Sequence, residues 1–173
     1  MDAIRSLQDA CIAATGLALA FRLPPLFRTP REVTAATLVR GLACLEAIFL
    51  VGHPDLYGIV YRALGGVPAL PQFLQHLAAL LLAYQARIFM IQVTGSAPPG
   101  RRAERRRLAA WAVALTTCYA LGPLRAGLPM LDPRGSADGG VVAYVVLWQS
   151  ALAVVLVDAV RRGLRHAVTG GTG

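Results

Sequence analysis

Four ionisable side chains stand inside long apolar stretches, where a charge is costly: Arg40, Glu46, His76 and Arg87. On insertion scales, a charged residue at the centre of a membrane helix costs roughly 2.5–3.5 kcal/mol. Each of these side chains therefore needs an opposite charge, a hydrogen-bond partner or water. Two uses follow from this requirement. The residues either brace neighbouring helices through ion pairs, or line a polar path for a solute or a proton.

The spacing of these residues suggests how they could meet. Glu46 lies near the middle of its apolar stretch, so it could pair with Arg87 or with Arg40 and, together with His76, line a path. Helix geometry places Arg40 and Glu46 about 120° apart, too far to share one stripe. Gln72, His76, Ala83 and Arg87 follow one another at helical spacing and predict a polar stripe that faces the bundle interior.

A structural role is favoured for most of these residues. Arg40 and Arg87 each lie about seven residues from an expected helix end, roughly 10 Å by helical rise, which is within reach of the membrane surface. His76 lies close to the opposite surface, where hydration suffices for it. Asp158 precedes Arg161 and Arg162 by three and four residues, which predicts a local ion pair rather than a site.

Other signatures of chemistry are absent from the sequence. It contains no nucleotide-binding glycine loop, no zinc-protease motif, no serine-hydrolase elbow and no paired acidic motif for Mg²⁺. Cys11, Cys44 and Cys118 lie in separate apolar stretches and form no CxxC pair. We therefore expect no enzymatic activity, no cofactor and no metal site.

The composition indicates the elements that carry these residues. Hydrophobic residues make up 56% of the chain and charged residues 15%, with a mean hydropathy of +0.56, which exceeds the needs of a soluble core. The apolar stretches predict an all-α, polytopic transmembrane helix bundle as a single domain over residues 1–166, with a flexible tail at 167–173. Its five expected spans lie near 6–23, 33–52, 69–94, 108–128 and 140–160. The first has a short uncharged centre, so four spans remain if it does not cross.

Local signals refine these elements. Pro24–Pro25 predicts the end of the first helix, and Gly122–Pro123 predicts a kink or a loose turn in the fourth span. Asp55–Leu64 has the pattern of an interfacial helix or half-helix rather than a crossing. Three aromatic residues fall near expected interfaces and are interpreted as members of an aromatic belt: Trp111, Tyr119 and Tyr144.

The arginines predict the orientation. All of the 17 basic residues are arginine. The loops after the first and third spans and the C-terminal tail hold eleven of them, whereas the N-terminus and the other loops hold four. Because cytoplasmic segments are enriched in arginine, the N-terminus is expected outside and the C-terminus inside a bacterial plasma membrane. Without the first crossing, the N-terminus would be cytoplasmic.

The most basic segment lies before the fourth span and contains Arg101, Arg102, Arg105, Arg106 and Arg107. We expect it to form a cytoplasmic loop that could bind lipid headgroups or a partner protein, although orientation alone accounts for its charge. For the same reason nucleic acid is not an expected partner. The expected partners are the lipid bilayer and either further copies of the chain or another membrane or cytoplasmic protein.

Short motifs occur in a recognisable order along the chain. They are Pro30-Arg31-Glu32, Pro54, Val60-Tyr61-Arg62, Gly66-Val67-Pro68, Leu74-Gln75-His76 and the arginine-rich segment. In this order the chain, over Pro30–Leu121, resembles a family of actinobacterial multi-pass membrane proteins that carry a transporter label and are often encoded beside helix-turn-helix regulators. Members are typically longer, with about seven helices, so the resemblance is to a short or truncated form. It implies a transport-related role and supplies no catalytic or binding residue.

Two functions are therefore expected, with transport of an unknown solute ahead of the other. The alternative is a non-catalytic sensory, regulatory or assembly module that acts through the basic segment. A transporter would place Glu46, His76 and Arg87 around a water-accessible pocket. A module would bury them in ion pairs and use the basic segment as a docking surface.

Overall fold

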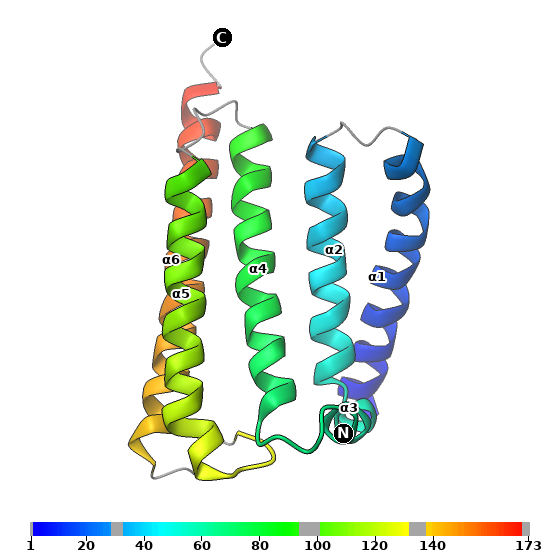
Figure 1. Cartoon of the computed structure of the whole chain (residues 1–173). Helices are drawn as coiled ribbons and strands as arrows, with labels where there is room; N and C mark the ends of the chain where they lie inside the picture. The colour runs from blue at the N-terminus through cyan, green and yellow to red at the C-terminus, as the bar shows by residue number, and fades with distance from the viewer. Residues whose placement is uncertain (1, 29–32, 94–100, 132–137, 171–173) are drawn as a thin grey trace.

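The chain folds as a bundle of helices in a computed structural model that describes residues 2–28, 33–93, 101–131 and 138–170 (Figure 1). In these ranges every regular element is a helix, which confirms the all-α prediction. The elements are α1 (Asp2–Arg28), α2 (Val33–Gly52), α3 (Pro54–Ala63), α4 (Leu70–Val93), α5 (Arg101–Tyr119), the π-helical turn η1 (Ala120–Leu124) and α6 (Gly139–Gly170).

The long helices run alternately up and down the bundle. α1, α2 and α4 lie side by side, and α5 and α6 lie beyond α4 (Figure 1). α3 lies across the end at which α2 finishes and α4 begins. This alternation brings the C-terminal ends of α1, α4 and α6 to the same end of the bundle as the N-terminal ends of α2 and α5. The segments rich in arginine therefore share one end, which we call the arginine-rich end.

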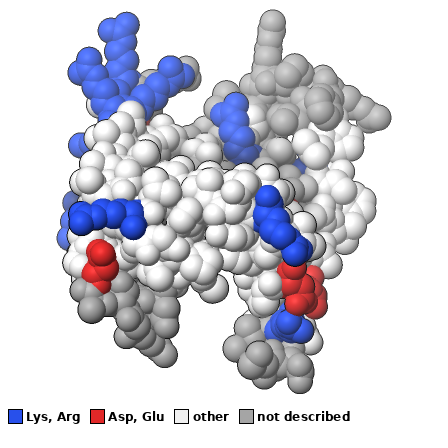
Figure 2. All heavy atoms as spheres, turned by 60° about the horizontal axis from the view of Figure 1, so that its bottom comes forward, with Lys and Arg blue, Asp and Glu red and all other residues white. Residues whose placement is uncertain are grey.

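Within the described ranges, three helical segments are long and apolar enough to cross a membrane: Thr34–Gly52, Leu70–Val93 and Gly139–Arg165. They correspond to the second, third and fifth expected spans. Large apolar side chains on their outer surfaces, such as Val146, Val154 and Val160, are exposed, as expected for contact with hydrocarbon rather than water. Figure 2, which turns the α3 end toward the viewer, shows a mostly uncharged face with charged groups in a few separate places.

Several helix boundaries differ from the sequence-based expectations. α1 continues past Pro24–Pro25 to Arg28, because a proline removes its own hydrogen-bond donor and does not prevent later residues from donating. α5 begins at Arg101, so the basic segment expected as a loop is its first two turns; arginine is a good helix former. α6 continues to Gly170, so residues 167–170 are helical rather than part of a tail.

The buried core lies between α4, α5, η1 and α6. Tyr119 and Tyr144 belong to it, with 6% and 0% of their surface exposed, which corrects their assignment to an aromatic belt. Tyr119 stacks on Phe73 with 4.4 Å between ring centroids and donates a hydrogen bond of 2.6 Å to the carbonyl oxygen of Pro68. Burial is tolerated because the hydroxyl groups find partners inside the bundle.

The irregular turn expected at Gly122–Pro123 is present as η1. Pro123 lies inside the turn and cannot donate a backbone hydrogen bond, which favours the widened π-type geometry. Gly122 faces the backbone of Gly140 so closely that an added Cβ would lie 2.4 Å from the Gly140 carbonyl carbon and oxygen. A glycine is required here because two backbones approach each other directly.

We predict that Gly122→Ala destabilises the protein by about 1–3 kcal/mol, the usual cost of overpacking a core, because the Gly140 backbone cannot move aside like a flexible side chain. Gly58→Ala is the matched control. Gly58 lies in α3 with nothing within 4 Å of its added Cβ, so alanine should be neutral or slightly stabilising there. Denaturant unfolding of the purified protein in detergent measures both. Equal stability of the two variants would contradict the close approach.

Candidate functional site

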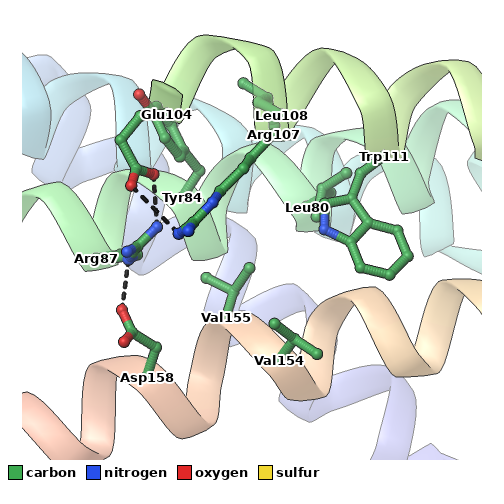
Figure 3. A pocket seen from close by; sticks show the side chains of 10 residues that line it. All are labelled: Leu80, Tyr84, Arg87, Glu104, Arg107, Leu108, Trp111, Val154, Val155 and Asp158. Atoms are coloured by element: carbon green, nitrogen blue, oxygen red, sulfur yellow. Dashed lines mark hydrogen bonds and ion pairs between the residues drawn. The ribbon is translucent and has the colours of Figure 1, made fainter. Parts of the chain in front are cut away.

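The structure collects three charged side chains from three helices near the arginine-rich end. Arg87 of α4 lies between Glu104 of α5 and Asp158 of α6 (Figure 3). Its Nη1 donates to Glu104 Oε2 at 2.5 Å, and its Nε donates to Asp158 Oδ2 at 2.5 Å. Arg87 is 7% exposed and Glu104 is 2% exposed. We call these three residues the Arg87 triad.

The triad satisfies a requirement of electrostatics. A buried guanidinium needs opposite charge and several acceptors, and two carboxylates supply both. The second negative charge is offset by Arg107, whose exposed side chain places Nη1 3.7 Å from Glu104 Oε1, one helical turn along α5. Glu104 Oε1 nevertheless has no hydrogen-bond partner in the described part of the chain. A buried carboxylate oxygen of this kind is free to accept a further donor.

A cavity of about 290 Å³ opens beside the triad between α4, α5 and α6. Its polar end is formed by the triad and Arg107, and its other end by apolar and aromatic side chains. The latter are Leu80, Tyr84, Leu108, Trp111, Val154 and Val155. Figure 3 shows Arg107 directed toward the triad and Trp111 further along α5. The arrangement is suited to binding, since its carboxylates are engaged by arginine rather than held as a free acid and base.

His76 is held by aromatic side chains of α6. Its Nδ1 lies 2.8 Å from the Tyr144 hydroxyl, and its ring stacks on Trp148 at 4.2 Å between centroids. Hydration alone was expected to suffice for His76, and that expectation is wrong because the ring packs between helices. Gln72 lies one turn earlier on α4. Its Oε1 accepts a hydrogen bond from the Leu131 backbone N–H, and its Nε2 donates to the Leu131 carbonyl oxygen at 3.4 Å. The polar stripe predicted on this helix therefore faces the bundle interior, which confirms that prediction.

Glu46 lies on a different side of the bundle. It accepts a hydrogen bond from the Thr15 hydroxyl of α1, so the predicted pairing with Arg87 or Arg40 is wrong. The reason is rotational: Glu46 faces α1, whereas Arg87 faces α5 and α6. Arg40 is exposed on α2 and forms no ion pair within the residues that the structure describes. It remains free to extend its side chain toward the arginine-rich end.

The basic segment presents its arginines outward from the first turns of α5. Arg102, Arg105, Arg106 and Arg107 are exposed. The side chain of Arg101 lies outside the described residues. The acid among them, Glu104, points the opposite way, into the bundle. One face of α5 therefore carries the basic surface, and the opposite face contributes Glu104 to the Arg87 triad.

At the opposite end, polar contacts join α1 to α3. His53 Nε2 lies 3.1 Å from Asp9 Oδ1, and Arg5 Nη2 donates to Asp55 Oδ1 at 2.7 Å. Tyr57 of α3 donates to the Pro129 carbonyl oxygen at 2.7 Å. Burial, with smaller contributions from neighbouring tyrosines, raises the pKa of Tyr57, which keeps its hydroxyl protonated as a donor. These contacts position the ends of the helices.

Glu104 and Asp158 were not singled out as site residues by sequence. The sequence spacing predicts that Asp158 pairs locally with Arg161 and Arg162. The side chain of Arg162 lies outside the described residues. The structure pairs Asp158 with Arg87 of α4. One signal could have found Glu104, because it is the lone acid in a run of five arginines. If this segment is a helix, its single acid lies on a different face from most of the arginines, and that difference marks Glu104 as a candidate partner for a buried cation.

Comparisons with known proteins give no further guide to the site, because no family model, curated protein or solved structure matches the chain. In the described residues no group of three or more His, Cys, Asp or Glu side chains is placed to hold a metal ion. The chemistry of the site is therefore judged from its own geometry.

We predict that Arg87→Met destabilises the protein by about 3–5 kcal/mol, because it leaves two carboxylates without their buried counter-charge. Arg40→Met, which removes an exposed arginine from a neighbouring helix, should have a much smaller effect. Replacing the whole triad with Met, Gln and Asn at 87, 104 and 158 should recover much of the loss, since no buried charge then remains unpaired. Unfolding in detergent by denaturant measures all three variants. A similar loss in Arg40→Met and Arg87→Met would contradict the triad's role.

Proposed function

We propose that the chain is an integral protein of a bacterial plasma membrane with five crossings, an external N-terminus and a cytoplasmic C-terminus. Three helical segments have the length and hydropathy of membrane spans. α1 and α5 complete the alternating bundle beside them, which supports two additional crossings (Figure 1). The gathering of arginines at one end supports placing that end in the cytoplasm.

Within this placement we propose a non-catalytic regulatory or assembly module. The observation that carries this proposal is the locking of Arg87 between carboxylates of two other helices. Glu46 accepts from Thr15 on another face of the bundle, and His76, on the same stripe of α4 as Arg87, bonds to Tyr144 instead. Each of the three ionisable residues therefore has its own partner, and this argues against one shared polar path. A module needs a stable membrane-embedded scaffold of this kind, whereas a carrier needs a shared, hydrated site.

The basic first turns of α5 are the proposed docking surface. Cations at a helix N-terminus oppose the helix dipole at a cost of roughly 0.3–1 kcal/mol each, so their accumulation there is not explained by helix stability. Exposed Arg102, Arg105 and Arg106 suit an acidic segment of a membrane or cytoplasmic protein, or of another copy of the chain. Orientation and docking together explain the positive charge without a nucleic-acid partner.

Transport is the second candidate, in agreement with the resemblance to proteins that carry a transporter label. The observation that favours it is the cavity beside the triad, which presents both signs of charge inside the bundle. To serve transport, this cavity would have to connect to water on both sides in turn. Accessibility therefore separates the two proposals.

We predict the pattern of labelling by a membrane-impermeant thiol reagent in intact cells, using single cysteines in a background without Cys11, Cys44 and Cys118. For the proposed topology, cysteine at Ser6 is labelled directly and cysteine at Arg106 only after permeabilisation. For a packed module, cysteines at Glu46 and Leu80 stay protected in both conditions, like a control cysteine at lipid-facing Val113.

Labelling at Glu46 and Leu80, with Val113 still protected, would favour the carrier and count against the module. Labelling of Arg106 without permeabilisation would overturn the orientation. If the cysteine at Ser6 were labelled only after permeabilisation, and the cysteine at Arg106 behaved as predicted, the N-terminus would be cytoplasmic and the chain would have four crossings.

A further inference from the structure

We propose that the cavity between α4, α5 and α6 is a binding site for one phospholipid with a zwitterionic, primary-ammonium headgroup. The ammonium would meet Glu104, the phosphate would meet Arg107, and an acyl chain would lie along the apolar end of the cavity. This inference rests on the proposed membrane placement and adds a ligand to it.

The oxygen of Glu104 that accepts no hydrogen bond is the first observation. Glu104 is almost wholly buried, lines the cavity and has one carboxylate oxygen without a hydrogen-bond donor in the described part of the chain. Its other oxygen is taken by Arg87. A buried acceptor left in this state is costly unless a donor arrives, and an ammonium group supplies three.

The charge of the lining is the second observation. Two arginines and two carboxylates line the cavity, so its formal charge is zero and it favours a zwitterion over a net anion or cation. Arg107 is 68% exposed at the outer edge and carries donors beyond its 3.7 Å contact with Glu104. In such a headgroup two carbons separate the ammonium from the phosphate. This spacing matches the Glu104 carboxylate and the Arg107 guanidinium, which are one helical turn apart on α5.

The direction of the cavity is the third observation. Along each of the three helices, the charged residues lie toward the arginine-rich end and the apolar residues lie toward the middle of the bundle. Arg87 follows Leu80 by seven residues, roughly 10 Å along α4, and Trp111 follows Glu104 at the same interval along α5. This polarity matches a lipid whose head lies at the membrane surface and whose chain points inward (Figure 3).

Size and access agree with a single lipid rather than water. Pockets for small ligands begin near 300 Å³, and about 290 Å³ accommodates a headgroup and the upper part of one chain. Val154, at the apolar end, is 57% exposed, so the cavity is open toward the side of the bundle where lipid would enter. Water alone would have to occupy an end lined by leucine, valine and tryptophan.

The test is a lipid titration of the full chain in detergent, followed by native mass spectrometry and thermal unfolding. Phosphatidylethanolamine should bind one per chain at least roughly tenfold more tightly than phosphatidylcholine or phosphatidylglycerol, and should raise the melting temperature. Glu104→Gln and Arg107→Gln should each reduce this binding roughly tenfold, whereas Arg106→Gln, an exposed neighbour outside the cavity, should keep it.

A further variant guards against loss of folding. Val155→Phe leaves every charge in place and fills the apolar end, so it should lose lipid binding while melting at the same temperature as the unmodified protein, or higher, without lipid. If all variants bound phosphatidylethanolamine equally, the proposed site would be overturned. The same would follow if Val155→Phe bound this lipid as tightly as the unmodified protein does.

The remaining outcomes also decide the proposal. Tighter binding of phosphatidylglycerol, lost in Arg107→Gln alone, would replace the ammonium site with a phosphate site and overturn the role of Glu104. Displacement of the lipid by soluble glycerophosphoethanolamine at equal concentration would show that the chain contributes nothing, and would overturn a lipid site. The titration in detergent does not depend on topology, so its result is separate from the labelling result that tests the proposed function.

Discussion

The packing of α4, α5 and α6 depends on the neutralisation of Arg87. An arginine that is 7% exposed within an apolar bundle is sustained only by opposite charge at hydrogen-bonding distance. Glu104 and Asp158 supply that charge from two other helices, so the electrostatic requirement of one residue fixes the relative height of three helices. The triad lies nearer the arginine-rich end, and the relative height that it gives the three helices also aligns the aromatic core around Tyr119 and Tyr144, further along the bundle.

The two halves of the bundle are held by interactions of different kinds. α4, α5 and α6 share charged contacts, a continuous core and the backbone contact of Gly122 with Gly140. α1 is joined to its neighbours by its packing on α2, by the hydroxyl contact of Thr15 with Glu46 and by polar contacts at its N-terminal end. α2 bridges the two halves through its packing on α1 and α4. The cavity lies between the three helices that the Arg87 triad joins.

The sequence predicts the all-α class and the three apolar helical segments Thr34–Gly52, Leu70–Val93 and Gly139–Arg165 well, because apolar length is a local property. It also predicts the face of α4, because Gln72, His76 and Arg87 share one helical stripe. It does not predict partners across helices, since rotation about the helix axis decides whether Glu46 meets α1 or α4. The same limit explains why Asp158, judged only against arginines on its own helix, was not recognised as a partner of Arg87.

The start of α5 shows why a structural and a binding role can share one segment. The first turns of α5 have one face against the bundle and one exposed face, so RRAERRR divides its charges by helical angle. The acid turns inward to neutralise Arg87, and the arginines turn outward. Arg107 lies between the two faces, because its side chain is exposed and yet its Nη1 is 3.7 Å from Glu104 Oε1. A charge placed at that boundary can respond to what occupies the cavity, which connects the stability of the triad to the lipid and protein surroundings of the helix.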